Sequence, residues 1–548
     1  MAFVGGEVFN GRGTHPVRTD VGVAAGRISA LGIREVASRT GPTTRIVDLT
    51  GRLLLPGFID AHVHPIEGGT ERLTCDLSGA STREEYLALV RQYAEAHPDR
   101  QWIVGGGWAQ AAFPGGAPLA RDLDAICPDR PVVISNRDHH SAWVNSLVLR
   151  MVGIDATTPD PADGRIERDV DGEPTGTLHE GARMMALRLT PPQSLDSMYD
   201  GLLEAQRYLH SVGITGWQDA LIGDYGNHSR RFVDIYQRAI EHGRLTARVN
   251  GALWWDRDRG LDQLDDLLAV RAEHQDEQFR ITTVKIMQDG VPENRTAAVI
   301  DPYLRPGSSC GAAGSGISFI DPMKLQDYVT RLDHEGFQVH FHAIGDRAVR
   351  EALDAVAAAR TRNRRPGATH HIAHLQIVHP GDVARFLTHR VAANIQPLWA
   401  AYDPQMVELN LPLLGAERAG WQYPFASLEA AGADLCVGSD WPVTSADPWL
   451  GIHVAVNRQH PAGHPDRSSE VFLPHQRLGL AQALQAYTAG SARINGRDHY
   501  SGSIRRGYVA DLVVADRNPF ALPRDQIAET RTAETFFAGV SVYRADSS

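Results

Sequence analysis

The sequence predicts an α/β fold: a distorted TIM (β/α)8 barrel with a small β-sandwich domain built from both termini and an inserted α+β subdomain after strand 1. Three observations predict it. The middle of the chain alternates strand-like and helix-like segments, both ends contain short alternating stretches broken by glycines, and one connection between strands is far too long for a loop.

The two ends of the chain resemble each other. Residues 1–55 contain short stretches of alternating apolar and polar residues between glycines, and residues 490–548 repeat this style. Such alternation between turn residues is typical of β-hairpins. We therefore expect one β-sandwich domain from residues 1–55 plus 490–548, with the rest of the chain inserted between its halves.

The middle of the chain, residues 56–75 plus 196–489, is expected to form the barrel. Helix-like stretches lie between most of its strand candidates; in residues 346–360, for example, Ala348, Val349, Ala352 and Val356 fall on one face. Eight βα units can close a barrel whose active site forms at the C-terminal strand ends. The strand candidates are residues 53–64, 213–220, 245–255, 281–290, 338–346, 369–376, 391–397 and 434–442.

The segment of residues 76–195 is too long for an ordinary connection between a strand and a helix. It contains strand-like stretches of its own at residues 101–108 and 131–138. We expect an inserted α+β subdomain that lies over the barrel mouth and shapes substrate access.

Composition narrows the classes of function. The 548 residues are 43% hydrophobic and 22% charged, as in soluble globular proteins, and the net charge of -12 argues against nucleic acid or an anionic membrane as the main partner. The four cysteines form no CxxC pair, and neither an export signal nor an apolar run of about 18 residues is visible. The expected protein is a cytoplasmic enzyme with a small-molecule substrate.

The first strand candidate ends in His62-Val63-His64. Side chains alternate along a strand, so the two imidazoles project from one face about 7 Å apart and can bind one metal ion. Taken alone, the pair could equally be two half-buried histidines of an ordinary strand. Other residues able to bind a metal occur in or at the ends of later strand candidates, and this coincidence favours a metal site. They are Lys285, His342, His374 and Asp440.

Several longer motifs are spread over the chain: LPGFIDAHVH (55–64), DHHSAWVN (138–145), GEPTG (172–176), VKIMQDG (284–290), HAIGD (342–346), GSDWP (438–442) and GYVADLVV (507–514). Through these motifs the sequence resembles the amidohydrolase superfamily, and within it the YtcJ-like branch (amidohydrolase 3) that includes N-substituted formamide deformylase. The resemblance runs nearly from end to end. One departure is His139, which occupies a position where glycine is expected and adds a second imidazole beside His140.

The resemblance implies that a divalent metal, usually zinc, is bound at His62, His64, His342, His374 and Asp440. Imidazole and carboxylate ligands suit zinc, although manganese, iron or cobalt could substitute. The resemblance also implies that Lys285 is carboxylated and bridges two metal ions. The alternative is a plain lysine that pairs with Asp289 or positions the substrate. By family analogy we expect a homodimer.

The implied chemistry is hydrolysis by metal-activated hydroxide, because a bound metal lowers the pKa of water to about 7. Asp440 would act as general base and then as general acid. His140 is the candidate that polarises the substrate carbonyl, with a structural role in the insertion as the alternative. Candidate substrate contacts, each of which could instead be structural, are Trp441, Trp108, Trp399, His139, Asn294 and Arg295.

The first functional hypothesis is hydrolysis of a C–N bond in an N-substituted amide or formamide. Carbamate, ester or cyclic-amide hydrolysis is the alternative, since the same hydroxide would serve. A deaminase of this fold usually has a glutamate three residues after the histidine at His342, where this chain has Gly345. A non-catalytic binding relative would have lost a metal ligand, and none of the expected ligands is missing.

Overall fold

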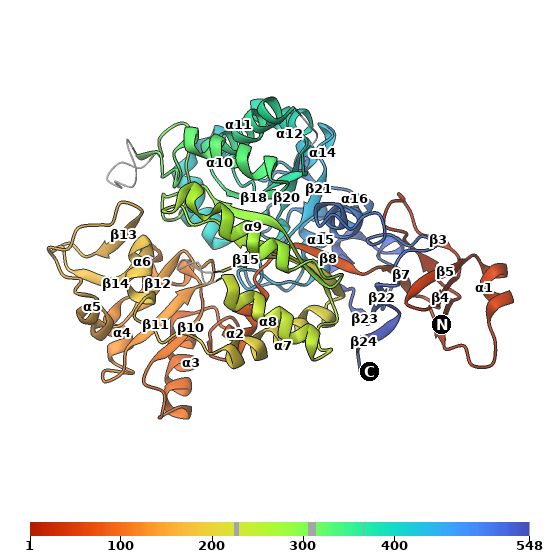
Figure 1. Cartoon of the computed structure of the whole chain (residues 1–548). Helices are drawn as coiled ribbons and strands as arrows, with labels where there is room; N and C mark the ends of the chain where they lie inside the picture. The colour runs from red at the N-terminus through yellow and green to blue at the C-terminus, as the bar shows by residue number, and fades with distance from the viewer. Residues whose placement is uncertain (224–228, 305–313, 365–366, 547–548) are drawn as a thin grey trace.

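The computed structural model describes residues 1–223, 229–304, 314–364 and 367–546. Three parts are visible in Figure 1: a central barrel, the inserted segment (orange to yellow) on one side of it, and the sheets formed by the two termini (red and blue) on the other. Both ends of the chain lie in this last part. Among the described residues, no helix combines the length and apolar character that crossing a bilayer requires.

The barrel consists of eight parallel strands, as predicted, and is nearly closed. The last strand meets the first where the backbone N–H of Asp440 donates a hydrogen bond to the carbonyl oxygen of His62, at 2.7 Å. In spatial order the strands are β8 (Phe58–Val63), β15 (Ile214–Ile222), β16 (Arg248–Trp254), β17 (Phe279–Met287), β18 (Gln338–Ala343), β19 (His370–His374), β20 (Val391–Ile395) and β21 (Leu435–Val437).

Helices surround the barrel and share its core. In α11 (Asp346–Asn363), Ala348, Val349, Ala352 and Val356 are all buried, which is the face that the spacing predicts. The other helices that follow the insertion are α7 (Leu195–Ser211), α8 (Ser229–Glu241), α9 (Leu264–Glu273), α10 (Pro322–His334), α12 (Val383–His389), α13 (Leu411–Ala419), α14 (Phe425–Ala430), α15 (Pro448–Asn457), α16 (Leu480–Gln485) and α17 (Ser491–Ile494).

The prediction of one continuous strand over residues 53–64 is wrong. The segment divides at Gly57 into β7 (Leu53–Pro56), which belongs to a terminal sheet, and β8, which belongs to the barrel. A Cβ atom at Gly57 would lie 2.2 Å from Oγ1 of Thr215 on the neighbouring strand, so only glycine fits where the chain passes between the two sheets. The apolar residues continue across this point, which explains the single predicted strand, although the predicted domain boundary after residue 55 lies beside the break.

The terminal sheets combine strands from both ends of the chain. β7 pairs antiparallel with β22, and the rings of Phe3 and Phe536 meet edge to face at 5.1 Å. One sheet contains β24 (Val540–Arg544), β23 (Thr532–Phe537), β22 (Leu512–Ala515), β7, β2 (Glu7–Val8) and β3 (Val17–Arg18), and the other β5 (Arg27–Leu31), β4 (Val21–Ala24), β1 (Ala2–Val4) and β6 (Ile46–Asp48), with α1 (Ile33–Arg39) beside them.

The inserted segment forms a six-stranded mixed sheet with its own apolar core. Both strand-like stretches expected there are strands. In spatial order the sheet contains β13 (Gly164–Arg168), β14 (Pro174–Glu180), β12 (Ser141–Val144), β11 (Val132–Asn136), β10 (Ile103–Trp108) and β9 (Cys75–Asp76), and its helices are α3 (Arg83–Ala96), α4 (Ala120–Asp124), α5 (Ser146–Val152) and α6 (Gly181–Leu187). The helix α2 (Pro65–Arg72) connects β8 to this segment.

Candidate active site

A cavity lies at the C-terminal ends of the barrel strands and is walled on one side by the insertion. It contains every residue that the sequence predicts as a metal ligand, together with side chains from α2, from residues 138–140 and from α6. Its lining consists of His62, His64, Glu67, Asp138, His139, His140, Arg183, Ala220, Leu221, Trp254, Lys285, Met287, Val291, His342, Ile344, His374, Trp399, Asp440, Pro442 and Val443.

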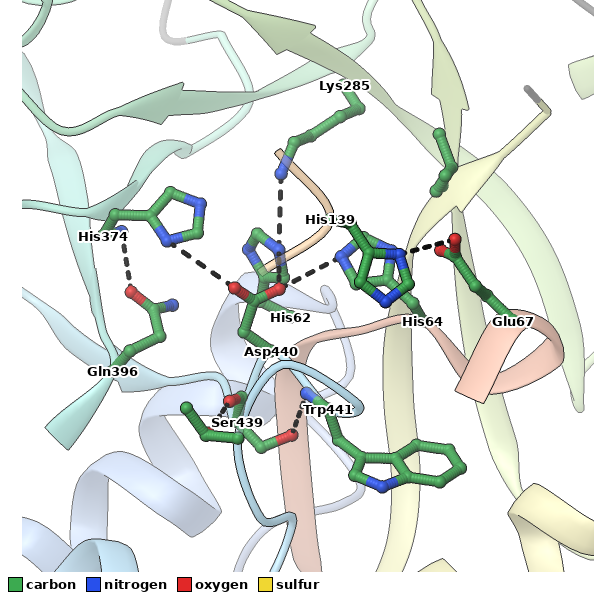
Figure 2. A network of polar contacts seen from close by, with 12 residues as sticks. His62, His64, Glu67, His139, Lys285, His374, Gln396, Ser439, Asp440 and Trp441 are labelled. Carbon is green, nitrogen blue, oxygen red and sulfur yellow. Dashed lines mark hydrogen bonds and ion pairs between the residues drawn. The ribbon is translucent and has the colours of Figure 1, made fainter. Parts of the chain in front are cut away.

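Asp440 and the two histidines at the end of β8 form the centre of the site (Figure 2). Oδ1 of Asp440 lies 3.0 Å from Nε2 of His62 and 3.1 Å from Nε2 of His64. These three atoms all lie within 4.8 Å of one another, which is close enough to share one ion. Asp440 follows β21 in a left-handed conformation with φ of 59°, and this turn directs its carboxylate towards the histidines.

The remaining predicted ligands surround this centre. Nδ1 of His374 lies 3.9 Å from Oδ2 of Asp440, and the ring of His342 lies 4.4 Å from the ring of His374. Nζ of Lys285, on β17, lies 3.4 Å from Nε2 of His62. The barrel therefore brings together all six side chains, from five different strands or the turns that follow them.

Burial determines the protonation state of the site. It lowers the pKa of Lys285 to about 7, that of His62 to about 3, and the pKa of both His342 and His374 well below the ordinary value. Burial would raise the pKa of Asp440, but the charge and hydrogen bond of His62 outweigh it, and the pKa lies well below the usual range. Neutral imidazoles beside an ionised carboxylate are the forms that bind metal.

The residues present fit a divalent metal. Both ring nitrogens of His374 and Nδ1 of His64 are buried without a hydrogen-bond partner among the described residues, while Nδ1 of His342 lies 3.3 Å from Oδ1 of Asp289. Buried polar atoms are normally hydrogen-bonded, so imidazole nitrogens without such a bond beside a carboxylate fit a divalent metal. The nitrogen and oxygen donor set suits zinc and its neighbours in the first transition row.

Residues beneath the ligands hold them in place, and the sequence analysis did not identify them. Nε2 of His340 lies 3.0 Å from Nδ1 of His62, while the Asp60 carboxylate accepts hydrogen bonds from the backbone N–H groups of His62 and Ser439. Such contacts fix the orientation of a ligand ring. The signal was present in the sequence, because His340-x-His342 has the same spacing as His62-x-His64.

His140 enters the cavity from the insertion as an ion pair with Glu180. Its Nδ1 lies 2.9 Å from both carboxylate oxygens of Glu180, and its ring lies 5.6 Å from that of His342. Burial opposes protonation, but the charge of Glu180 raises the pKa of His140 to about 9. His140 is therefore a cationic hydrogen-bond donor near neutral pH. Glu180 was not among the predicted site residues.

His139 lines the same wall between two glutamates of α2. Its Nδ1 lies 2.7 Å from Oε1 of Glu67 and its Nε2 lies 3.0 Å from Oε1 of Glu71. The backbone has a φ of 62° here, a conformation that glycine adopts without strain. This agrees with the glycine that the resemblance leads us to expect, and the two ion pairs help to hold histidine in its place.

The predicted substrate contacts divide between cavity and core. Trp399 lines the cavity and stacks on His374, with ring centroids 5.5 Å apart. Trp108 is buried in the insertion, where its Nε1–H donates to the carbonyl oxygen of Ile134. The indole of Trp441 points away from the ligands (Figure 2) and lies 5.1 Å from the ring of Tyr208.

The two residues expected in the loop after β17 do not line the cavity either. Asn294 is buried and its Oδ1 accepts a hydrogen bond from Nε2 of Gln110, at 2.9 Å. Arg295 has a φ of 58° and is absent from the lining. This loop therefore joins the barrel to the insertion rather than reaching the centre of the site.

Known proteins resemble the chain over almost its whole length. Residues 45–543 match the model of the amidohydrolase family. The putative amidohydrolase YtcJ of Bacillus subtilis is 30% identical, with 97% of this chain and 96% of the relative covered, and N-substituted formamide deformylase of Arthrobacter pascens is 26% identical, with 96% and 95% covered. A crystal structure of an uncharacterized metal-dependent hydrolase from Pyrococcus horikoshii superimposes with a TM-score of 0.73 at 25% identity, covering 95% of this chain and 98% of that one.

Proposed function

The chain belongs to the amidohydrolase family and is a metal-dependent hydrolase; from this premise we propose that it hydrolyses the C–N bond of an N-substituted amide or formamide. The similarity to N-substituted formamide deformylase supports this substrate class. The observation that carries the proposal is the position of Asp440, whose carboxylate faces three histidines in a cavity lined by both apolar and charged side chains.

We assign the metal ligands to His62, His64, His342, His374 and Asp440, with zinc as the preferred ion. Once bound, zinc polarises a carbonyl oxygen and lowers the pKa of water towards about 7. Lys285 has the properties that carboxylation requires: it is buried, and its pKa of about 7 leaves a large neutral fraction at neutral pH. A carboxylated Lys285 would add an anionic ligand and could bridge two ions.

The chain supplies a proton acceptor at the centre of the site. Asp440 is ionised at neutral pH, so its carboxylate can take a proton from the attacking water and then deliver it to the nitrogen of the leaving amine. The histidines around the carboxylate favour its ionised form, and the turn after β21 fixes its direction. Asp440 therefore serves both as base and as acid.

The insertion supplies a charged hydrogen-bond donor. His140 is protonated because Glu180 accepts from its Nδ1, which leaves its Nε2–H to donate to the carbonyl oxygen of the substrate. A charged donor stabilises the negative charge that develops on this oxygen. Glu180 acts through His140 as a positioning residue.

The deaminase hypothesis is disfavoured by packing as well as by sequence. A Cβ atom at Gly345 would lie 2.0 Å from the carbonyl oxygen of Ala298, so the glutamate of a deaminase does not fit at this position. The next residue, Asp346, accepts a hydrogen bond from the backbone N–H of Ile300 and lies outside the cavity lining.

A panel of matched compounds tests the proposal. Zinc-loaded protein is assayed with formanilide, acetanilide, a phenyl carbamate and phenyl acetate, and kcat/KM is compared after subtraction of the uncatalysed rate. We expect the highest ratio of catalysed to uncatalysed rate for one of the two anilides. Preferential hydrolysis of the ester or carbamate would support the alternative, and metal binding without hydrolysis of any compound would contradict the proposal.

A further inference from the structure

Arg183, on α6, is a cation in the cavity wall with no role in the chemistry described above. Its side chain is 94% buried, being only 6% exposed, and it lines the same cavity as the metal ligands. Within the part of the chain that the structure describes, it makes no hydrogen bond or ion pair, and its Nε is buried without a partner. Buried guanidinium groups are normally paired, because leaving such donors unsatisfied costs free energy.

The carboxylates of this side of the cavity contact other groups and make no ion pair with Arg183 among the described residues. Oε1 of Glu67 lies 2.7 Å from Nδ1 of His139. Both oxygens of Glu180 contact His140. Oδ1 of Asp138 accepts hydrogen bonds from Nδ2 of Asn136 and from the backbone N–H of His140. The N–H groups of the Arg183 guanidinium are therefore available to a molecule that enters the cavity.

From this we infer that Arg183 forms an anion-binding subsite, and that the substrate is an amide carrying a carboxylate or a similar oxyanion on one of its two halves. A guanidinium presents a planar fork of N–H donors that matches the two oxygens of a carboxylate. Apolar side chains of the same cavity, among them Leu221, Met287 and Val291, would surround the rest of the substrate. This inference rests on the proposed function for the reaction, but anion binding can be measured separately.

The inference is tested with two substrates that differ mainly in charge. Zinc-loaded protein is assayed with 4-formamidobenzoate and with 4-formamidobenzamide, which replaces the carboxylate by a neutral amide of similar shape. We expect a higher kcat/KM for the benzoate. In Arg183→Gln this preference should fall by about 10- to 100-fold, the factor that corresponds to losing a hydrogen bond to a charged group.

Two further variants serve as controls. Arg183→Lys retains the charge without the planar fork, and we expect an intermediate preference. Arg188, an exposed arginine that follows the same helix, lies outside the cavity lining, so Arg188→Gln should retain the preference of the unmodified protein. Circular dichroism and thermal unfolding of each variant show whether the fold is intact.

A binding measurement separates the failure of this inference from the failure of the proposed reaction. Isothermal titration calorimetry of the zinc-loaded protein with benzoate and benzamide should show tighter binding of benzoate, and Arg183→Gln should remove that difference. If neither formamide is hydrolysed but this pattern holds, the proposed reaction is wrong and the subsite stands. If Arg183→Gln binds benzoate with the same preference as the unmodified protein, the anion is bound by the metal and the inference is wrong. The inference is also wrong if Arg183→Gln loses kcat/KM equally for 4-formamidobenzoate and 4-formamidobenzamide.

Discussion

Asp440 is joined to His62 twice: its backbone N–H donates to the carbonyl oxygen of His62 at 2.7 Å, and its Oδ1 lies 3.0 Å from Nε2 of the same residue. The first contact closes the barrel between its last and first strands, and the second forms the centre of the site. Closure of the fold and assembly of the site therefore depend on the same pair of residues.

The role of Asp440 is tested with Asp440→Asn, which retains the shape and one oxygen but cannot accept a proton. We expect kcat for an anilide to fall by about 10³-fold or more while zinc content stays largely unchanged. A matched control is Asp447→Asn, because Asp447 caps α15 through the backbone N–H of Trp449 and asparagine caps equally well. Near-normal turnover of Asp440→Asn would refute its role as base.

The ion pair of His140 and Glu180 is expected to act as one unit. His140→Gln should lower kcat by about 10²-fold, because a donor to the carbonyl oxygen is lost, and Glu180→Gln should lower it in the same direction. The double variant should be little worse than His140→Gln, since Glu180 acts through His140. Losses that multiply in the double variant would show two independent roles.

Lys285 is expected to be carboxylated when two metal ions are bound. A crystal structure grown with excess zinc and bicarbonate should show density for the carbamate and two metal positions, and elemental analysis should approach two ions per chain. An unmodified Lys285 with one ion per chain at saturation would exclude the binuclear site. That result would leave the mononuclear mechanism intact.

Acid should destabilise the fold through His210, which is remote from the metal ligands. Its Nδ1 lies 2.9 Å from the carbonyl oxygen of Ile214, and burial lowers its pKa to about 4, whereas an unfolded histidine has a pKa near 6.5. As the pH falls, the histidine in the unfolded protein is protonated at a higher pH than His210 in the folded protein. The free energy of unfolding therefore decreases between about pH 6.5 and about pH 4, by up to roughly 3 kcal/mol. Unfolding temperatures measured across this range should fall less steeply for His210→Gln; identical slopes would contradict the assignment.

Much of the barrel, and the clustering of the proposed ligands in one cavity, could be predicted from the sequence for physical reasons. The strand segments are buried and contain regular apolar runs, and polar residues such as His374 and Asp440 stand out where these runs end. Because parallel strands in a barrel end at one rim, the sequence alone could indicate that these residues meet. The strand prediction for residues 53–64 missed the break at Gly57, which depends on a single close approach to Thr215, although the predicted domain boundary after residue 55 lies beside it.

The cavity wall could be predicted much less well. Glu67 and Arg183 come from α2 and α6, and Glu180, which pairs with His140 of this wall, comes from the end of β14; their positions depend on how the insertion packs over the barrel. Trp108 was expected in the cavity because its segment was expected to face the barrel mouth, but its indole is buried in the core of the insertion. The ends of strands can be located directly in the sequence, whereas the packing of the insertion against the barrel can hardly be predicted from it.

The central claim is that the buried histidines and Asp440 bind a divalent metal on which amide hydrolysis depends. It is tested most directly by removing metal with a chelator, measuring residual zinc by mass spectrometry, and titrating zinc back while hydrolysis of formanilide or acetanilide is followed. We expect activity to disappear with the metal and to return in proportion to bound zinc, with His62→Ala failing to recover. Hydrolysis that continues in metal-free protein would contradict the account.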